Sequence, residues 1–223
     1  MSRARLLAVA LAVAALTGCG GGSGGHATVW VTRDEGRQVL IVKQVPSGLT
    51  AMQALERVAK VDTRYGGRFV ESIDGVSGSL SKQRDWFYFV NGIEADRGAS
   101  EYRLHPGDLE WWDYRSWSNG REHVPVVVGA FPEPFLHGYG GKKRPAVVVG
   151  SGPGARALAR LLHGRVVAGD PPRDANVLRL VPGGAPRFTA GERLGGAVEL
   201  NFSGNALRLA RRPSLYRYRY EVP

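Results

Sequence analysis

The sequence predicts an α+β protein with a small sheet covered by one helix, followed by a second small α/β domain. Three observations predict it. Runs of alternating apolar residues flank one short helical pattern in the first half. In the second half, an apolar strand passes through closely spaced glycines into a helix. Charge divides in the same way, since residues 19–137 carry 13 Lys and Arg against 15 Asp and Glu, whereas residues 138–223 carry 15 against five.

Residues 1–18 are predicted to be a cleavable lipoprotein signal peptide. Arg3 and Arg5 precede an apolar run at residues 6–16, which is shorter than the roughly 20 residues that span a bilayer. Small residues then lead into Cys19, and this segment resembles the bacterial lipobox. We expect Cys19 to carry diacylglycerol and palmitate and to anchor the chain on the extracytoplasmic face of the cell membrane. The alternative is an unmodified cysteine after an ordinary signal peptide.

The residues after Cys19 divide into a tether, two domains and a connector. Residues 19–26 form a lipidated Gly-rich tether. A first domain is predicted at residues 27–117, a Pro/Gly-rich connector with one short apolar strand at 118–141, and a basic α/β domain at 142–223. Because Cys19 is the sole cysteine, the chain can form neither an intramolecular disulfide nor a thiolate metal site.

The first domain is expected to contain five strands and one helix. Thr50 and Gln53 have the spacing of a capping box at the start of the helix. Met52, Leu55 and the pair at 58–59 follow at helical spacing and form one apolar stripe. The strands are predicted at residues 27–32, 38–45, 68–73, 85–90 and 109–115.

Several motifs in this domain resemble the transcobalamin-like C-terminal domain family. They include Gly48-x-Thr50, the segment from Trp86 to Gly92 (WFYFVNG), and Gly107-Asp108-x-x-x-Trp112-x-Tyr114. The resemblance covers roughly 90 residues and implies a β-grasp-like mixed sheet. It also implies cobalamin as a candidate ligand, although the large helical partner domain of the animal carriers is missing from this sequence.

A dense aromatic set on two strands is the candidate ligand-binding site of this domain. Alternation places Trp86 and Tyr88 on one face of their strand, and Trp112 and Tyr114 on the face opposite Trp111. Two interpretations stay open, namely packing in the core or against the second domain, and a flat platform for an apolar ligand. The candidate residues are Trp86, Tyr88, Asn91, Trp111, Trp112 and Tyr114.

The second domain contains a sequence similar to a dinucleotide-binding fingerprint. A strand at 145–149 leads through Gly150-x-Gly152-x-x-Ala155 into a helix at 155–162, and a strand at 165–168 ends near Asp170. Too few residues follow for a complete doubly wound domain, so we expect no dinucleotide there. The glycines are explained by a tight strand-to-helix turn, and a phosphate or carboxylate contact at the helix terminus is the alternative.

The end of the chain alternates tyrosine with arginine. Tyr216, Tyr218 and Tyr220 are separated by Arg217 and Arg219, which predicts a terminal strand with tyrosines inward and arginines in solvent. The alternative is a basic stripe that faces anionic polymers of the cell surface.

No catalytic, metal or resident cofactor site is predicted. The five histidines are scattered, no pair of them has the i, i+4 spacing of a metal site, and His105 is interpreted as structural. The sequence also lacks a G-x-S-x-G elbow.

The leading hypothesis is therefore a non-catalytic binding lipoprotein that captures a small molecule, such as a corrinoid, for an uptake transporter. The alternative is an envelope module that docks on an anionic polymer or a protein partner. A surface enzyme is the third and least favoured reading, and nucleic acid is not an expected partner.

Overall fold

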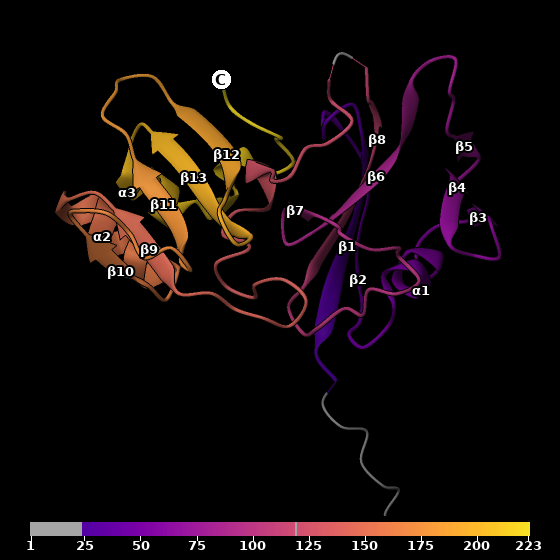
Figure 1. The fold of residues 1–223 in the computed structure, drawn as a ribbon, viewed down its shortest axis with the longest axis horizontal. Coiled ribbons are helices and arrows are strands. Elements are labelled where there is room, and N and C mark those ends of the chain that lie inside the picture. Colours follow the sequence, from indigo (N-terminus) through magenta and orange to yellow (C-terminus); the bar gives the residue numbers. More distant parts are fainter. Residues whose placement is uncertain (1–23, 119) are drawn as a thin grey trace, which may run out of the picture.

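The computed structural model describes residues 24–118 and 120–223 and confirms the α+β class (Figure 1). The predicted signal peptide and Cys19 lie outside these residues. Two five-stranded sheets and one three-stranded sheet make up the described part of the chain.

The first five-stranded sheet forms the centre of the N-terminal domain. Its strand order is β2-β1-β8-β6-β7, with β1 parallel to β8 and the other neighbours antiparallel. The sheet is therefore mixed, as expected. Its strands are β1 (His26–Arg33), β2 (Gln38–Pro46), β6 (Arg84–Val90), β7 (Ile93–Glu94) and β8 (Leu109–Ser116).

Helix α1 (Ala51–Glu56) begins at the predicted capping box. The backbone N–H of Gln53 donates to Thr50 Oγ1 (3.2 Å), and that of Thr50 donates to Gln53 Oε1 (3.0 Å). Met52 and Leu55 are buried as predicted, whereas Val58 and Ala59 of the expected stripe lie beyond the end of the helix and are half-buried. The helix thus covers one face of the sheet with the side predicted for it.

The strand predicted at 68–73 does not join this sheet. It is β4 (Phe69–Ile73), and it pairs with β3 (Val61–Arg64) and β5 (Val76–Ser77) in a separate three-stranded sheet. Tyr65, Gly66 and Gly67 all have positive φ and close a local β3–β4 hairpin. The prediction of one sheet was wrong because the backbone groups of β4 form their hydrogen bonds with the neighbouring strands β3 and β5.

The second five-stranded sheet belongs to the C-terminal domain and has the order β10-β9-β11-β13-β12. Four strands are parallel, and only β12 is antiparallel to its neighbour. The strands are β9 (Ala146–Val149), β10 (Arg165–Val167), β11 (Asn176–Leu180), β12 (Arg187–Arg193) and β13 (Ala197–Ser203). Helices α2 (Gly152–Leu161) and α3 (Ala206–Arg211) follow β9 and β13. Helix α2 begins three residues earlier than predicted because Pro153 suits a first helical turn.

The connector and the tail differ from their predictions. The apolar strand expected within 118–141 is instead the 3₁₀ helix η1 (Val128–Ala130), with one isolated bridge between Val126 and Ile93. The expected terminal strand is instead the 3₁₀ helix η2 (Pro213–Tyr216) followed by turns. Its side chains nevertheless alternate as predicted, since Tyr220 is buried and Arg217 and Arg219 are exposed.

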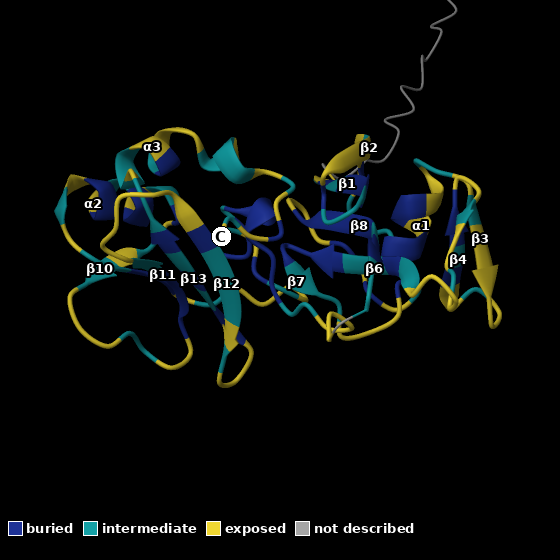
Figure 2. Cartoon of the chain, turned by 90° about the horizontal axis from the view of Figure 1, so that it is seen from above, coloured by how far each residue is buried: buried dark blue, intermediate teal, exposed yellow. Residues whose placement is uncertain are grey.

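Both faces of the first five-stranded sheet are buried at β1, β6 and β8, whereas β2 at its edge is mostly exposed (Figure 2). One face packs under α1, and the other packs against the connector and the tail. Val127 and Ala130 of the connector contribute to that second core, as does Tyr220. The connector therefore joins the two domains through packed side chains.

Of the helices in residues 24–118 and 120–223, none has the length and apolar character needed to cross a bilayer.

Candidate functional site: a cleft between the domains

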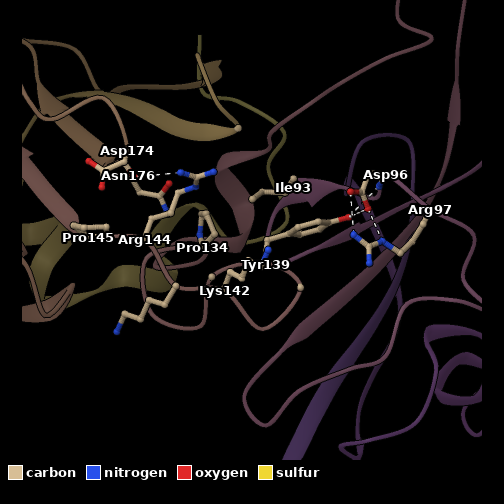
Figure 3. A pocket seen from close by; sticks show the side chains of 14 residues that line it. Ile93, Asp96, Arg97, Pro134, Tyr139, Lys142, Arg144, Pro145, Asp174 and Asn176 are labelled. Carbon is tan, nitrogen blue, oxygen red and sulfur yellow. Dashed lines mark hydrogen bonds and ion pairs between the residues drawn. The ribbon is translucent and has the colours of Figure 1, made fainter.

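A cleft of about 550 Å³ lies where the two domains and the connector meet (Figure 3). The N-terminal domain contributes Ile93, Asp96 and Arg97 from β7 and the loop that follows it. The connector contributes residues around Tyr139, and the C-terminal domain contributes its strand-end residues Asp174 and Asn176 together with Gly196. The volume lies in the range of small-molecule sites.

Two adjacent lysines line the mouth of the cleft at the end of a tight turn. The backbone groups of Tyr139 and Lys142 bond to each other in both directions, each at 3.0 Å. Gly140 and Gly141 between them have φ values of 57° and 74°. Positive φ at both central residues is the requirement of a type I′ turn, which glycine meets without strain. The turn therefore presents Lys142 and Lys143 to solvent at the mouth of the cleft.

The turn is held against the N-terminal domain by aromatic and amide contacts. The ring of Tyr139 lies 5.3 Å from that of Tyr102, and the N–H of Gly140 donates to the Tyr102 hydroxyl (2.8 Å). Asn91 is completely buried behind the turn and donates to the carbonyl of Gly138 (2.8 Å). It also donates to Asp108 Oδ1 (2.7 Å). Of the six predicted site residues, two bond to the cleft wall: Asn91 to the carbonyl of Gly138, and Tyr88, whose hydroxyl donates to the carbonyl of Arg97.

The cleft is electropositive because four basic side chains line it against two carboxylates, and one of these, Asp96, is already paired. Asp96 receives two hydrogen bonds from the guanidinium of Arg97 (2.8 and 3.1 Å) and one from the Tyr139 hydroxyl (2.7 Å). The bond from Arg97 lowers the pKa of Asp96. Within the described residues, neither Lys142 nor Lys143 forms an ion pair.

Arg144 ties the cleft to the C-terminal domain. Its guanidinium donates to the carbonyl oxygens of Asp174 (3.3 Å) and Gly195 (2.5 Å). Both acceptors are neutral, so the positive charge of Arg144 is not cancelled by them. Together with the two lysines, it gives the cleft three cations that form no ion pair in the described chain, against the one remaining carboxylate of Asp174. The arrangement suits an anionic group on a small ligand.

The predicted aromatic site lies mostly in the protein core. Trp111 is completely buried, and Trp86 and Trp112 are 6% and 3% exposed. Tyr88 stacks on Trp112 (centroids 4.8 Å apart), and Tyr114 lies 5.3 Å from Trp86. The two faces are divided as alternation predicted, and the packing interpretation is confirmed.

A ligand role for these aromatics stays a prediction. Trp86 and Tyr88 border a shallow hollow of about 440 Å³ together with Asp85, Glu94 and Glu192. The carboxylates make this hollow acidic, in contrast with the basic cleft.

Neither the cleft nor the histidine–carboxylate pairs of the described chain were predicted from the sequence; the three pairs are His105–Asp108, His123–Glu94 and His137–Glu133. Glu133 and His137 are four residues apart, and Glu133 Oε1 lies 2.6 Å from His137 Nδ1. Their i, i+4 spacing was a signal that could have been read. No group of three or more His, Cys, Asp or Glu side chains in the described part of the chain is arranged to hold a metal ion.

The glycines of the fingerprint-like segment have structural roles. Gly150 and Gly152 have φ values of 154° and 81° in the turn from β9 into α2. A Cβ on Gly154 would lie 2.6 Å from the Cβ of Ala206, so Gly154 permits close packing of α2 on α3. The tight-turn interpretation therefore accounts for these residues.

Comparisons with known proteins match the first domain. Residues 48–116 match a family model described as a domain of unknown function (DUF4430). This match lies within residues 27–117, the range predicted to be transcobalamin-like, and covers less than half of the chain. No curated protein matches this chain.

Two solved structures show limited similarity. A candidate metal binding protein from Ruminococcus gnavus ATCC 29149 is 20% identical with a TM-score of 0.34, over 41% of this chain and 97% of that one. Haptocorrin in complex with Cbi is 14% identical with a TM-score of 0.32, over 42% of this chain. The similarity spans only 26% of the haptocorrin chain. At these TM-scores neither likeness extends to the whole fold.

Proposed function

We propose that this chain is a non-catalytic binding protein that captures a small anionic molecule in the cleft between its domains. The observation that carries the proposal is the set of cations at the cleft, where Lys142, Lys143 and Arg144 lack carboxylate partners in the described chain. A ligand phosphate or carboxylate would provide the missing charge and would gain charge-assisted hydrogen bonds.

The cellular setting of this proposal follows from Cys19. A lipid on that residue would hold the protein on the extracytoplasmic face of the membrane, where it would pass the captured molecule to an uptake transporter. A corrinoid is the first ligand to test because the sequence of residues 27–117 resembles the transcobalamin-like family. Its nucleotide loop carries one phosphate, which is the group of this ligand that would contact the cleft cations.

A fluorescence titration tests the cleft and the ligand together. The chain from residue 20 onward is titrated with hydroxocobalamin while tryptophan emission is followed. We expect saturable quenching at micromolar ligand. Replacing both Lys142 and Lys143 by glutamate should weaken binding at least 10-fold, because charge reversal opposes the anionic group.

The matched control is the Lys60→Glu and Lys82→Glu double variant, which reverses two exposed lysines far from the cleft lining. It should bind like the unmodified chain. An absence of quenching at tens of micromolar ligand would exclude the corrinoid. Equal binding by both double variants would place the ligand outside the cleft.

An envelope interaction module is the second candidate function. The observation that favours it is the row of exposed arginines on the C-terminal domain, several of which make no ion pair among the described residues. This function predicts retention on the cell surface that is lost at high salt when Cys19 is replaced by alanine, because salt screens attraction between exposed charges.

A further inference from the structure

Helices α2 and α3 form one continuous surface on the C-terminal domain. Each follows a parallel strand of the sheet after a two-residue turn, so both run back along the sheet from the same edge. Gly154 lies against Ala206 near the start of the two helices. Their buried sides carry Leu158 and Leu209, which pack on the sheet. Their opposite sides therefore face solvent next to each other.

This solvent side is occupied by arginine. Arg156 and Arg160 are four residues apart and share the outer face of α2. Arg208 and Arg211 are three residues apart on α3, and Arg212 caps it. We call this set the arginine face; its members are Arg156, Arg160, Arg208, Arg211 and Arg212, and all five are exposed.

The charge of the arginine face is not balanced locally. Neither helix contains an aspartate or a glutamate. Among the described residues, none of the five arginines forms an ion pair. Arg160, Arg208 and Arg211 gain some stabilisation from the helix C-termini. This does not neutralise them, so the face attracts a partner with a dense negative charge.

We propose that the arginine face docks on the anionic phospholipid surface of the membrane to which the chain is anchored. The position of the tether favours lipid over other polyanions. Gly24 is the first described residue, and Gly25 is held by hydrogen bonds to its carbonyl from the N–H and hydroxyl of Ser47 (2.8 and 2.7 Å). Gly24 follows Cys19 by five residues, a length of chain that spans at most about 18 Å. A lipid at Cys19 would therefore keep the domains close to the headgroups.

The described chain presents the arginine face and β2 on the same side of the molecule. Figure 2 shows α3 and β2 along one side, with β2 exposed. Leu40 and Val42 of β2 are 41% and 46% exposed, so this side of the molecule also presents apolar side chains on the N-terminal domain, apart from the arginine face. Surfaces that lie on anionic bilayers typically combine basic and apolar side chains. The choice of lipid over other polyanions rests on the proposed anchoring at Cys19, whereas the attraction of the arginine face for negative charge does not.

Vesicle sedimentation tests the proposal without the anchor. The chain from residue 20 onward is mixed with vesicles of phosphatidylcholine alone, or with 30% phosphatidylglycerol, at about 50 and 500 mM salt. We expect at least 10-fold tighter binding to the anionic vesicles at low salt, and loss of this binding at high salt. Replacing Arg156, Arg160, Arg208 and Arg211 by glutamine should abolish the difference between the two kinds of vesicle.

The matched control removes the same charge from the other domain by replacing Arg57, Lys60, Arg68 and Lys82 with glutamine, all of which are exposed. This variant should keep most of the binding. Far-ultraviolet circular dichroism checks that both variants fold. Equal losses in the two variants would overturn the proposal, because they would show a dependence on net charge alone.

A soluble polyanion separates membrane docking from polymer docking. Binding to poly-glycerolphosphate without binding to anionic vesicles would overturn the proposal in favour of a cell-wall polymer. The corrinoid titration changes residues of the cleft, not of the arginine face, and it uses no vesicles. The vesicle experiment can therefore be interpreted even if the cleft binds no corrinoid.

Discussion

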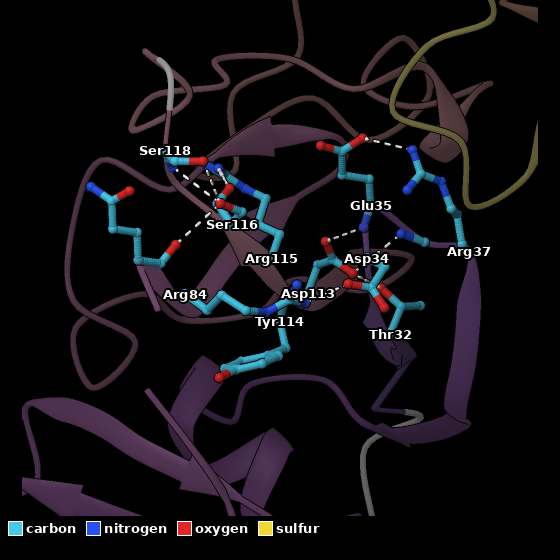
Figure 4. A network of polar contacts seen from close by, with 12 residues as sticks. Thr32, Asp34, Glu35, Arg37, Arg84, Asp113, Tyr114, Arg115, Ser116 and Ser118 are labelled. Carbon is cyan, nitrogen blue, oxygen red and sulfur yellow. Dashed lines mark hydrogen bonds and ion pairs between the residues drawn. The ribbon is translucent and has the colours of Figure 1, made fainter. Parts of the chain in front are cut away.

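The indole N–H of Trp111 donates a 2.7 Å hydrogen bond to the hydroxyl of Thr32. This hydroxyl donates in turn to Asp113 Oδ1 at 2.5 Å (Figure 4). All three side chains are buried. Asp113 also accepts from the backbone N–H groups of Glu35 (2.9 Å) and Gly36 (3.2 Å). The chain of bonds fixes the β1–β2 turn to β8 and gives the buried indole its acceptor.

Replacing Thr32 by valine should lower the free energy of unfolding by about 1–3 kcal/mol. Valine has nearly the same shape, but it leaves the Trp111 N–H and one Asp113 oxygen without that partner. Denaturation with urea measures the change. The control is Thr63→Val at an exposed position in β3, and it should change stability by less than about 0.5 kcal/mol. Equal effects would show that the buried bonds contribute little.

Gly36 permits the closest backbone approach between the β1–β2 turn and the C-terminal tail. A Cβ at this position would lie 1.7 Å from the carbonyl oxygen of Tyr218. Gly75 has almost the same φ (78° against 76°) but no atom within 4 Å of such a Cβ. We expect Gly75→Ala to cost about 1–2 kcal/mol from backbone strain alone. Gly36→Ala should cost clearly more, because the tail must also move.

Thermal unfolding and limited proteolysis of the tail measure this difference. The Gly36→Ala protein should be cleaved faster after Arg217 and Arg219 than the Gly75→Ala protein. If the two variants are equally stable and equally resistant, the turn and the tail do not stabilise each other.

The first domain was largely predictable because its signals are local. The capping box of Thr50 and Gln53 specifies where α1 begins, and alternation assigns Trp111 to one face of the sheet and Trp112 to the other. These patterns depend on residues within one element, so the sequence contains them directly.

The cleft could not be predicted because its residues come together only after both domains pack. Asp96, Tyr139 and Asp174 are widely separated in the sequence, and each lies in a loop without periodicity. The tail was mistaken for a strand for a related reason. Its alternation reflects contacts of Tyr220 with Trp111 across the molecule, and Tyr218 breaks the extended backbone with a φ of 65°.

Glu110 is fully buried in the first domain, and burial raises the pKa of its carboxyl well above the ordinary value. Oε1 accepts from the Trp112 indole (2.5 Å), whereas Oε2 has no partner among the described residues. The folded state therefore binds a proton that the unfolded state releases above a pH of about 4.3. The free energy of unfolding should therefore fall as the pH rises above the pKa of Glu110 in the unfolded state. The fall is up to about 1.4 kcal/mol per pH unit and ends when the pH reaches the pKa of Glu110 in the folded state.

Glu110→Gln should remove this dependence, because an amide keeps the acceptor for Trp112 and does not ionise. The variant should match the unmodified protein near pH 4 and be more stable at pH 7.5, as urea midpoints measured across that range would show. Glu56→Gln, at an exposed position on α1, controls for general charge effects. A constant difference between Glu110→Gln and the unmodified protein at every pH would contradict a buried, protonated Glu110.

Tyr220 is the aromatic anchor that holds the tail on the central sheet. Its ring lies edge-on to Trp111 and to Phe89, with both centroids 5.5 Å away, and it is 5% exposed. Tyr220→Ala should lower the free energy of unfolding by about 3–5 kcal/mol, the usual cost of removing a large buried aromatic ring. Trp111 would then gain contact with water, so tryptophan emission should shift to longer wavelength before global unfolding. Tyr65→Ala, at a site that is 79% exposed, should change neither quantity. An unshifted emission spectrum in Tyr220→Ala would mean that the connector alone is enough to exclude water from Trp111.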